Sequence, residues 1–457
     1  MKLTSFKETQ EYLESFIRPS VFERIKEDSH MIDPLDRMRV LLSLLGDPQK
    51  EFKSVQVSGT SGKGSTAYLL ANILEKAGYK TGLATSPHLQ SINERMQIDM
   101  RKISNEDLIG LVESLIPAIE KIKKLPEGEP SYFELLTAMA FMYFAQKQVD
   151  IAVVEVGLEG KYDATNVLDP LVIILTNISR DHVELLGNNE EEIANEAFSI
   201  IRKNELGDTP IIITGVDQEK LKDLILIKAN SIQADLKILG RDFTSSQPER
   251  TKSGTRFSYL EGEKRLADLE VRLRGGYQMV NASLAIASAQ ALGKQGFNIT
   301  DSALRNGLST AFFPGRFEVI ISSKQIVILD GAHNEAKMKA FLQALHDYYP
   351  TEEKVFIVGF KRNKDIETML RELLNKPDSE FIFTEFSKTG DYARSSSLSL
   401  SELKTNVESI GSRAEVFYQP NVQGAFTEAK NSTKKIIVVT GSLYLVGEMR
   451  ELIFPTE

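Results

Sequence analysis

Short apolar runs alternate with longer amphipathic segments along most of this chain. Runs of strand length end near positions 84, 156 and 177, and the last two are almost continuously apolar. Such runs are typical of parallel strands that are buried on both faces. Segments with helical periodicity lie between and after them, at 67–77, 133–146, about 190–203, about 217–227 and about 278–292. The alternation predicts an α/β fold with a mostly parallel sheet flanked by helices.

A domain boundary is expected where Phe313, Pro314 and Gly315 interrupt this alternation. Strand-like runs resume at once, at 317–321, 326–329, 355–359, 380–384, 414–418 and 435–440. Between 242 and 264, Ser, Thr, Arg and Glu dominate with strand-like alternation, which predicts hairpins or a loose excursion. We therefore expect a large N-terminal domain over 1–312 and a smaller Rossmann-like α/β domain over 313–457.

The composition is that of an ordinary globular protein. The 457 residues are too many for one typical core, and 42% of them are hydrophobic and 26% charged. A formal charge of −9 disfavours nucleic acid or an anionic membrane as a partner. The chain has no cysteine, which excludes disulfides, thiolate nucleophiles and cysteine metal sites. No apolar stretch is long enough to span a bilayer, and we expect a cytoplasmic location.

The most informative motif is a glycine-rich turn at 57–66, between a short apolar run and a helical segment. Its backbone N–H groups and the positive end of the helix suit a phosphate. Lys63 adds a point charge, and Ser65 or Thr66 adds a hydroxyl for Mg²⁺. The spacing differs from the common Walker pattern, and a glycine turn without a ligand is the alternative. We expect a P-loop ATPase-like domain that binds a nucleoside triphosphate through Gly59, Thr60, Gly62, Lys63, Gly64, Ser65 and Thr66.

Three further strand ends carry polar groups of chemical use. Ser86 and His88 follow one run, Glu155 ends the next, and Asp181 and His182 follow the third. Each group alone has a structural explanation, such as a buried carboxylate or a capping histidine. Ligands lie outside the carboxyl ends of the strands in open α/β sheets. Together these residues therefore predict an Mg²⁺ site beside a triphosphate.

The C-terminal half repeats this pattern of polar strand ends. The segments 329–334 and 440–445 each follow an apolar run with Gly and hydrogen-bonding side chains, and the polar loop 157–166 does the same after Glu155. Two domains that each present polar strand ends suggest chemistry that joins two bound partners.

The chain resembles a known family in a long series of ordered motifs. They are SGTSGKGST, TSPHLQSINER, SYFELLTA, EVGLEGKYDATN, TNISRDHVELLG, GYQMVNA, FPGRFE, LDGAHN and TGSLYLVGE. This order is similar to that of folylpolyglutamate synthase/dihydrofolate synthase, in the Mur ligase superfamily. The resemblance covers about 37–452, nearly the whole chain.

The resemblance implies an ATP-dependent ligase that uses Mg²⁺. ATP converts a carboxylate of folate or dihydropteroate to an acyl phosphate, and the amine of L-glutamate then attacks it. ADP and phosphate leave, and an amide remains. Water must be kept away from the acyl phosphate, so closure of the domains is expected. We expect neither nucleic acid nor membrane as a partner, and family members are mostly monomeric.

The resemblance also assigns roles to individual residues. Lys63, Glu155, His182, Arg316 and His333 are the expected catalytic residues. Ser65, Ser86 and Glu155 are expected to ligate one Mg²⁺ and His182 a second. The expected nucleotide contacts outside the glycine-rich loop are Asn281, Arg316 and Asp330. Tyr132, Phe133 and Glu134 are expected on the pterin side, and His333 and Ser442 near the incoming glutamate.

One departure from the family pattern bears on the metal site. The family usually has a carbamylated lysine that bridges the metals, and this chain has Ala197 at that position. Water or a neighbouring carboxylate such as Glu196 could substitute. The alternatives are a superfamily ligase with another acceptor and a non-catalytic nucleotide-binding descendant. A plain P-loop kinase is disfavoured, since it has no need of DGAHN and TGSLYLVGE.

Overall fold

The computed structural model describes residues 2–19, 33–158, 160–179, 189–204, 206–322, 324–362, 364–376, 379–387 and 396–455. The chain divides into two compact units. The first comprises Met1–Glu249, Arg256–Arg272 and Gln278–Ala311. The second comprises Arg250–Thr255, Leu273–Tyr277 and Phe312–Glu457. Each unit is described by itself below.

An eight-stranded sheet forms the centre of the first unit, in the order β4-β3-β2-β5-β1-β6-β7-β8. Neighbouring strands run parallel in the series β2-β5-β1-β6-β7-β8. Strands β3 and β4 add an antiparallel edge beside β2. Their bounds are β1 Lys53–Ser58, β2 Thr81–Ala84, β3 Met96–Ile98, β4 Arg101–Lys102, β5 Ile151–Glu155, β6 Val172–Leu175, β7 Ile211–Thr214 and β8 Leu236–Ile238. The mostly parallel sheet predicted from the apolar runs is thereby confirmed.

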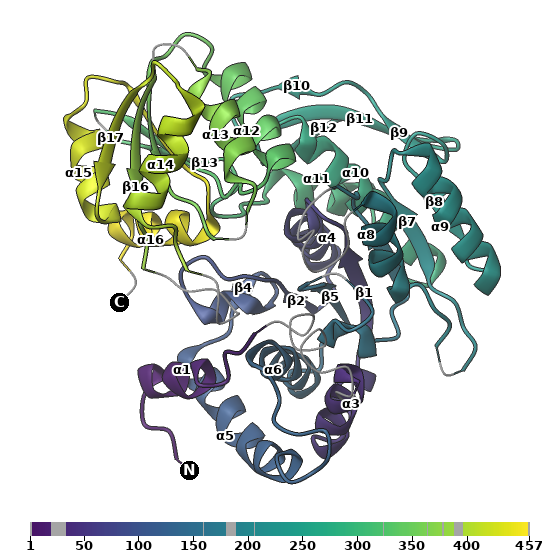
Figure 1. Ribbon diagram of the computed structural model, residues 1–457. Helices are drawn as coiled ribbons and strands as arrows, with labels where there is room; N and C mark the ends of the chain where they lie inside the picture. The colour runs from purple at the N-terminus through teal and green to yellow at the C-terminus, as the bar shows by residue number, and fades with distance from the viewer. Residues whose placement is uncertain are drawn as a thin grey trace. The chain divides into compact units, whose positions relative to one another are not determined.

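Helices cover both faces of this sheet (Figure 1). They are α1 Phe6–Glu14, α3 Pro34–Leu44, α4 Lys63–Lys76, α5 Asn105–Ile122, α6 Tyr132–Gln146, α8 Glu190–Ala197, α9 Glu219–Ile232, α10 Tyr277–Lys294 and α11 Asp301–Ser309. Single 3₁₀ turns are η1 Pro48–Lys50, η2 Ile92–Arg95, η3 Ala164–Val167 and η4 Phe198–Ile200. Helix α11 packs closely on α4, since a Cβ on Gly307 would lie 2.6 Å from the Ile73 backbone.

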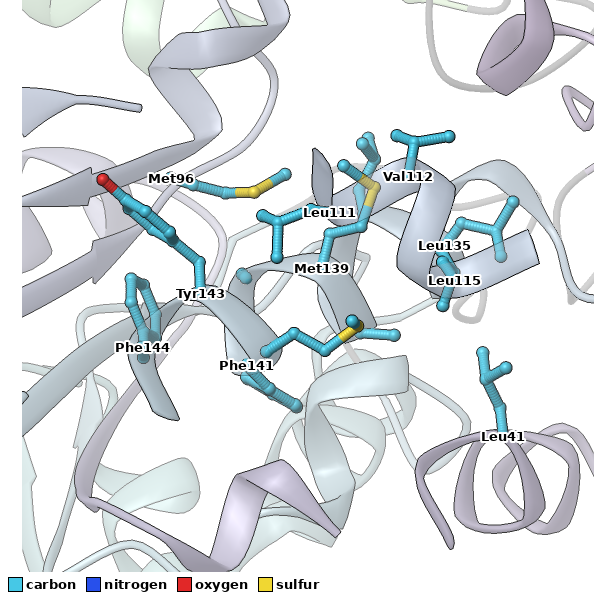
Figure 2. Close-up of a cluster of buried hydrophobic side chains, with 14 of the residues drawn as sticks. Leu41, Met96, Leu111, Val112, Leu115, Leu135, Met139, Phe141, Tyr143 and Phe144 are labelled. Carbon is cyan, nitrogen blue, oxygen red and sulfur yellow. The ribbon is translucent and has the colours of Figure 1, made fainter. Parts of the chain in front are cut away.

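A large apolar cluster fixes the position of α6 beside the sheet. It joins side chains of α3, α5 and α6 with Met96 of β3 (Figure 2). The members labelled there are Leu41, Met96, Leu111, Val112, Leu115, Leu135, Met139, Phe141, Tyr143 and Phe144. The start of α6 is fixed by a capping box, in which Ser131 and Glu134 each accept a hydrogen bond from the other's backbone N–H. The first residues of α6 are therefore held rigidly.

A small four-stranded sheet contains the polar segment that was expected to form hairpins. Its strands are β9 Phe243–Ser245, β10 Glu249–Arg250, β11 Thr255–Glu261 and β12 Lys264–Val271. Strands β9 and β11 pair antiparallel. Of the two expectations, hairpins or a loose excursion, the structure has antiparallel strands in this segment.

A six-stranded sheet forms the centre of the second unit, in the order β13-β14-β18-β15-β16-β17. All neighbours are parallel except β13 and β14. The strands are β13 Glu318–Ile321, β14 Ile326–Leu329, β15 Lys354–Val358, β16 Ser379–Thr384, β17 Glu415–Gln419 and β18 Ile436–Thr440. The helices are α12 Glu335–Tyr348, α13 Ile366–Leu374, α14 Leu400–Ile410, α15 Val422–Asn431 and α16 Leu443–Ile453.

The helix after the glycine-rich turn begins at Lys63, earlier than the apolar pattern indicates. Gly62 is its N-cap and adopts a left-handed conformation with φ of 85°. The loop residues Lys63 to Thr66 thus belong to the first turn of α4, where free N–H groups are available to a ligand. In the part of the chain that the structure describes, no helix is long and apolar enough to cross a membrane.

Candidate functional site

The glycine-rich loop between β1 and α4 requires glycine at two positions. Gly59 has a φ of 119°, and a Cβ there would overlap Thr176 Oγ1 and lie 2.8 Å from the carbonyl oxygen of Asn177. A Cβ on Gly62 would overlap Oδ1 of Asn281. The loop therefore passes directly against the residues that follow β6 and against α10.

Residues after β6 hold the loop by hydrogen bonds. The Thr60 N–H donates to the carbonyl oxygen of Asn177 at 2.9 Å, and the Ser61 N–H donates to Oδ1 of Asn177 at 2.9 Å. Thr60 Oγ1 accepts from the Ser179 N–H at 3.1 Å. The sequence predicts no role for Asn177 or Ser179, because their distance along the chain from the loop hides this contact.

The polar groups of the loop suit a bound anion. Lys63 Nζ donates to the carbonyl oxygen of Gly59 at 2.6 Å, which folds the ammonium group back over the loop. Ser61 Oγ and Thr66 Oγ1 are buried, and neither has a hydrogen-bond partner among the described residues. Buried hydroxyls without partners are costly, and these two lie in the loop for which the sequence predicts a phosphate ligand. Ser65 is also buried in the first turn of α4.

Asn281, an expected nucleotide contact, lies on α10 beside the loop. Its Oδ1 packs against Gly62, and its Nδ2 donates to Oε1 of Gln278 at 2.9 Å. Asn281 and Gln278 are both buried. Asn281 therefore fixes the approach of α10 to the start of α4.

The sheet register brings Glu155 and Ser86 beside the loop. Glu155 pairs with Val57 across β5 and β1, and its Oε2 accepts from the Ser86 N–H at 2.9 Å. Glu155 is buried at the carboxyl end of β5. Three of the strand ends predicted to meet at one edge do so. Asp181 and His182, at the fourth, lie outside the described residues.

The donor set at this edge fits a hard divalent cation. Ser65, Ser86 and Glu155 supply only oxygen atoms, as Mg²⁺ requires, and Mg²⁺ keeps several waters and phosphate oxygens as ligands. Over the described ranges, no group of three or more His, Asp or Glu side chains is arranged to hold a metal by itself. The residues present therefore fit one Mg²⁺ that is held partly by a phosphate ligand.

Ala197 lies in an apolar environment. It is fully buried in a cluster that includes Leu158, Ile173 and Phe198. The neighbouring carboxylate of Glu196 accepts from the Lys161 N–H at 3.2 Å. The described side-chain hydrogen bond of Glu196 is thus with Lys161 in the loop 157–166.

Asp163 is a buried carboxylate that organises this loop. It accepts from the Leu158 N–H and the Thr165 N–H, both at 2.9 Å, and from Thr165 Oγ1 at 2.5 Å. Thr165 Oγ1 in turn accepts from Gln56 Nε2 on β1 at 2.9 Å. Burial raises the pKa of Asp163, although these hydrogen bonds and Lys63 act in the opposite direction. The sequence predicts the polar loop but not this network, which links the ends of β5 and β1.

The start of α6 carries the three residues predicted on the acceptor side. Phe133 packs on the loop, because a Cβ on Gly157 would overlap its ring. Tyr132 is buried under the guanidinium of Arg95, 5.8 Å from the ring centre. Glu134 forms a buried ion pair with Arg37 at 2.8 Å and accepts from the Ser131 N–H at 2.6 Å. The described contacts of Glu134 therefore hold the start of α6 in place.

The segment after β2 forms a compact turn around Glu94. Its carboxylate accepts from the N–H groups of Leu89 and Gln90, at 2.7 and 3.2 Å. Burial alone raises the pKa of Glu94, but Lys102 and the Leu89 N–H outweigh it and lower the pKa. Arg95 Nε donates to His88 Nδ1 at 2.9 Å, which orients the imidazole.

In the second unit, Asp330 is buried at the carboxyl end of β14. Its two oxygens accept from the N–H groups of Phe317 at 2.8 Å and Ala332 at 2.9 Å. Burial raises its pKa from 3.8 to about 6, and Arg316 and Lys337 oppose the shift. Arg316 lies over the Phe313 ring at 5.3 Å. Arg316 and Asp330 thus form one electrostatic cluster.

His333 and Ser442 come from adjacent strand ends of the same unit. Leu329 and Val439 pair across β14 and β18, and the Gly441 N–H donates to the carbonyl oxygen of Ala332 at 3.0 Å. Ser442 caps α16 by accepting from the Tyr444 N–H at 3.2 Å. The residues expected near the incoming amino acid are therefore neighbours.

Family models match both halves of the chain. The Mur ligase middle domain matches residues 57–289, and the C-terminal domain of dihydrofolate synthetase matches residues 316–452. A dihydrofolate synthase/folylpolyglutamate synthase of Bacillus subtilis is 33% identical over 91% of this chain and 94% of its own length.

Solved structures agree with this relationship. The folylpolyglutamate synthase of Mycobacterium tuberculosis, in complexes with ADP and AMPPCP, superposes with a TM-score of 0.87 at 28% identity, over 99% of this chain and 98% of that one. An FPGS–AMPPCP–folate complex superposes with a TM-score of 0.78 at 28% identity, over 99% of this chain and all of that one.

Gly59→Ala tests the close approach of the loop to β6. We expect the substitution to destabilise the first unit by about 1–3 kcal/mol and to weaken binding of a nucleoside triphosphate at least about tenfold. Urea unfolding and calorimetric titration with MgATP measure the two effects. Gly110→Ala on the exposed face of α5, where a Cβ meets nothing within 4 Å, is the control and should leave affinity unchanged. Unchanged affinity in Gly59→Ala would contradict the expectation.

Asp330→Asn tests the raised pKa of Asp330. In the unfolded chain the carboxyl ionises near its ordinary pKa of 3.8, whereas in the folded chain it keeps its proton up to about pH 6. The native state therefore binds more protons in this window, and rising pH lowers stability through this group. The free energy of unfolding of the wild type minus that of the variant should fall between pH 4 and 6 and level off above. Urea unfolding across pH 4–8 measures it, and a pH-independent difference would refute it.

Proposed function

Since the chain belongs to the folylpolyglutamate synthase/dihydrofolate synthase family, whose members are ATP-dependent ligases, we propose that it joins L-glutamate to a carboxylate of folate or dihydropteroate. ATP is consumed and ADP and phosphate are released. The observation that supports this most directly is the meeting of the glycine-rich loop, Glu155 and Ser86 at one edge of the parallel sheet. The two family models match consecutive parts of the chain, and a ligase that joins two substrates needs both domains.

The first unit is proposed to hold the triphosphate. The N–H groups at the start of α4 face the phosphates in this proposal, with Lys63 as the neutralising charge, while Asn177 holds the N–H groups of Thr60 and Ser61. The contributing residues are Gly59, Thr60, Gly62, Lys63, Gly64, Ser65, Thr66 and Asn281. Lys63 would leave its contact with Gly59 to reach the phosphates. The buried hydroxyls of Ser61 and Thr66 support a ligand at this place.

Ser65, Ser86 and Glu155 are the proposed protein ligands of one Mg²⁺. When bound, the ion neutralises phosphate charge and orients the triphosphate for attack. Glu155 provides the single negative charge, and the Ser86 N–H holds this carboxylate in place. A second metal held by His182 is also proposed, and only the family resemblance of the sequence supports it. Ala197 cannot contribute a ligand to it.

The acceptor is proposed to lie beside the start of α6. Phe133 offers aromatic surface for a pterin ring and packs on Gly157, and the buried Tyr132 beneath Arg95 is proposed to support this surface. Glu134, which the sequence analysis placed at the acceptor, is proposed to act by holding this helix end through its pair with Arg37.

The chemistry follows from two nucleophilic attacks. An oxygen of the acceptor carboxylate attacks the γ-phosphorus and ADP leaves, and the amine of glutamate then attacks the acyl carbon and phosphate leaves. Arg316 is proposed to stabilise the charge that develops on the phosphoryl group. Asp330 is proposed to contact the nucleotide, and His333 and Ser442 the incoming glutamate. We also propose a cytoplasmic location, with which the cysteine-free composition agrees, and a monomeric state, which the family resemblance implies.

The proposed function is tested by glutamate-dependent release of ADP from MgATP. Purified protein receives dihydropteroate or tetrahydrofolate in separate reactions, and mass spectrometry identifies the product. We expect the acceptor to gain one glutamate residue, with ADP formed in equal amount. Lys63→Met should lower turnover at least about 100-fold, because it removes charge from the transferred phosphoryl group. ATP binding without turnover on either acceptor would overturn the proposed reaction.

Glu155→Gln tests the metal site. The amide oxygen still accepts from the Ser86 N–H, but the negative charge is lost. We expect the Mg²⁺ concentration for half-maximal ADP release to rise at least about tenfold, since even outer-shell partners of a metal contribute 10- to 100-fold. Glu106→Gln, at an exposed position of α5, is the matched control. An unchanged Mg²⁺ requirement in Glu155→Gln would exclude Glu155 as a ligand.

A further inference from the structure

Phe317, in the second unit, has a backbone conformation that bulky residues rarely adopt. Its φ is 48°, in the left-handed region, and its ring is buried against Phe341 and Tyr348. This conformation costs free energy in a bulky residue, so it persists only where the surrounding contacts hold it. Phe317 directly follows Arg316, the residue proposed to stabilise the phosphoryl group. The strained backbone therefore lies beside a proposed catalytic side chain.

Two hydrogen bonds fix the backbone on either side of Arg316. The Gly315 N–H donates to Oε2 of Glu318 at 2.9 Å, and the Phe317 N–H donates to Oδ2 of Asp330 at 2.8 Å. Both carboxylates are buried. Because the residues before and after Arg316 are held, the direction in which its side chain leaves the backbone is also held.

Packing contacts guide the Arg316 side chain further. Its guanidinium lies over the Phe313 ring, 5.3 Å from the ring centre. A Cβ on Gly331 would lie 3.2 Å from Nη1 of Arg316. Neither contact fixes the direction of the N–H donors, so that direction depends on the backbone turn 315–318 from which the side chain starts.

The last helix supplies the cation that faces Glu318. Nε of Arg450, on α16, donates to both carboxylate oxygens, at 3.1 and 3.0 Å. The side chain of Glu318 is 3% exposed and that of Arg450 is 16% exposed, so the pair is largely removed from water. A buried carboxylate that loses its cation is strongly disfavoured. Arg450 therefore allows Glu318 to lie where it accepts from the Gly315 N–H.

Helix α16 supports the turn at a second point. The Gly331 N–H donates to the carbonyl oxygen of Gly315 at 3.1 Å, and a Cβ on Gly331 would overlap Leu443 at the start of α16. Arg450 lies about two turns further along this helix. Both polar groups of the Gly315 backbone are thus held by residues that contact α16.

We propose that Arg450 is a positioning residue, which holds the turn 315–318 through Glu318 and thereby aims the Arg316 guanidinium at the phosphoryl group. The inference rests on the proposed function, because that function gives Arg316 its role. Arg450 touches neither substrate in this proposal. The rigid turn restricts a long and flexible side chain to one direction, and a misplacement of about 1 Å can cost about 100-fold in rate.

Arg450→Met tests the proposal, because it removes the cation and both hydrogen bonds to Glu318 but keeps an unbranched apolar side chain. We expect kcat for glutamate-dependent ADP release to fall about 10- to 100-fold, while KM for L-glutamate stays within about threefold. Arg450→Lys keeps a cation for Glu318 and should restore most of the lost kcat. An unchanged kcat in Arg450→Met would overturn the proposal.

A second variant keeps the test valid if Arg450→Met does not fold. The double variant Glu318→Gln/Arg450→Met leaves no unpaired buried charge. Its amide is no longer tied to α16, so we expect the same fall in kcat from a folded protein. Full activity in this double variant would contradict the proposal.

A double-mutant cycle with Arg316→Met separates positioning from a loss of folded protein. If Arg450 acts through Arg316, Arg450→Met should change kcat by no more than about twofold in the Arg316→Met background. A role in the fold alone would lower kcat by the same factor in both backgrounds. That result would overturn the assignment of Arg450 as a positioning residue.

Lys434→Met is the matched control in the same unit. The Lys434 side chain is also 16% exposed and pairs with Glu353 at 3.2 Å and Glu380 at 3.7 Å. It precedes β18 and so lies at the opposite end of that strand from Ser442. Its loss should leave kcat within about twofold, and a fall equal to that in Arg450→Met would overturn the assignment.

Crystal structures of the wild type and Arg450→Met without substrates separate this inference from the proposed reaction. In the variant we expect a displaced turn 315–318, a displaced Arg316 guanidinium and no hydrogen bond from the Gly315 N–H to Glu318. An unchanged turn would overturn the inference. No glutamate-dependent ADP release in the wild type would count against the proposed function only, because the displacement is seen without turnover.

Discussion

The parallel register of β5, β1 and β6 is the constraint on which the first unit's site depends. Because β1 lies between the other two strands, its carboxyl end meets Glu155 on one side and Thr176 on the other. The glycine-rich loop can turn toward α4 only by passing against Thr176, which is why Gly59 has no room for a side chain. The same three strands therefore position the phosphate loop and the carboxylate next to it.

Two buried carboxylates of the first unit hold the residues around the site in place. Asp163 and Glu134 are both surrounded by donors from the protein itself, in one case the loop 157–166 and in the other Arg37. Such fully satisfied networks rigidify their surroundings. Phe133 precedes Glu134 on α6 and packs on Gly157. The aromatic surface at the start of α6 is thereby rigid.

The second unit uses electrostatics in another way. One of its buried carboxylates, Asp330, has two backbone donors and still has a raised pKa, because burial outweighs Arg316 and the hydrogen bonds. The strand ends around it supply cations and helix N-termini. Such an arrangement favours anionic ligands. This matches a reaction in which phosphate and carboxylate groups meet.

The sequence by itself determined the α/β fold, the parallel strands and the glycine-rich loop, because these depend on local periodicity and on glycines that few other residues can replace. It also predicted that Ser86 and Glu155 lie at one edge of the sheet, because the carboxyl ends of parallel strands share an edge. Only the tertiary structure decided the partners of each polar group. The pairing of Arg37 with Glu134, the bonds from Asn177 to the loop and the donors around Asp163 join residues far apart in sequence or within an irregular turn. No periodicity records such contacts, because they depend on how separate elements pack.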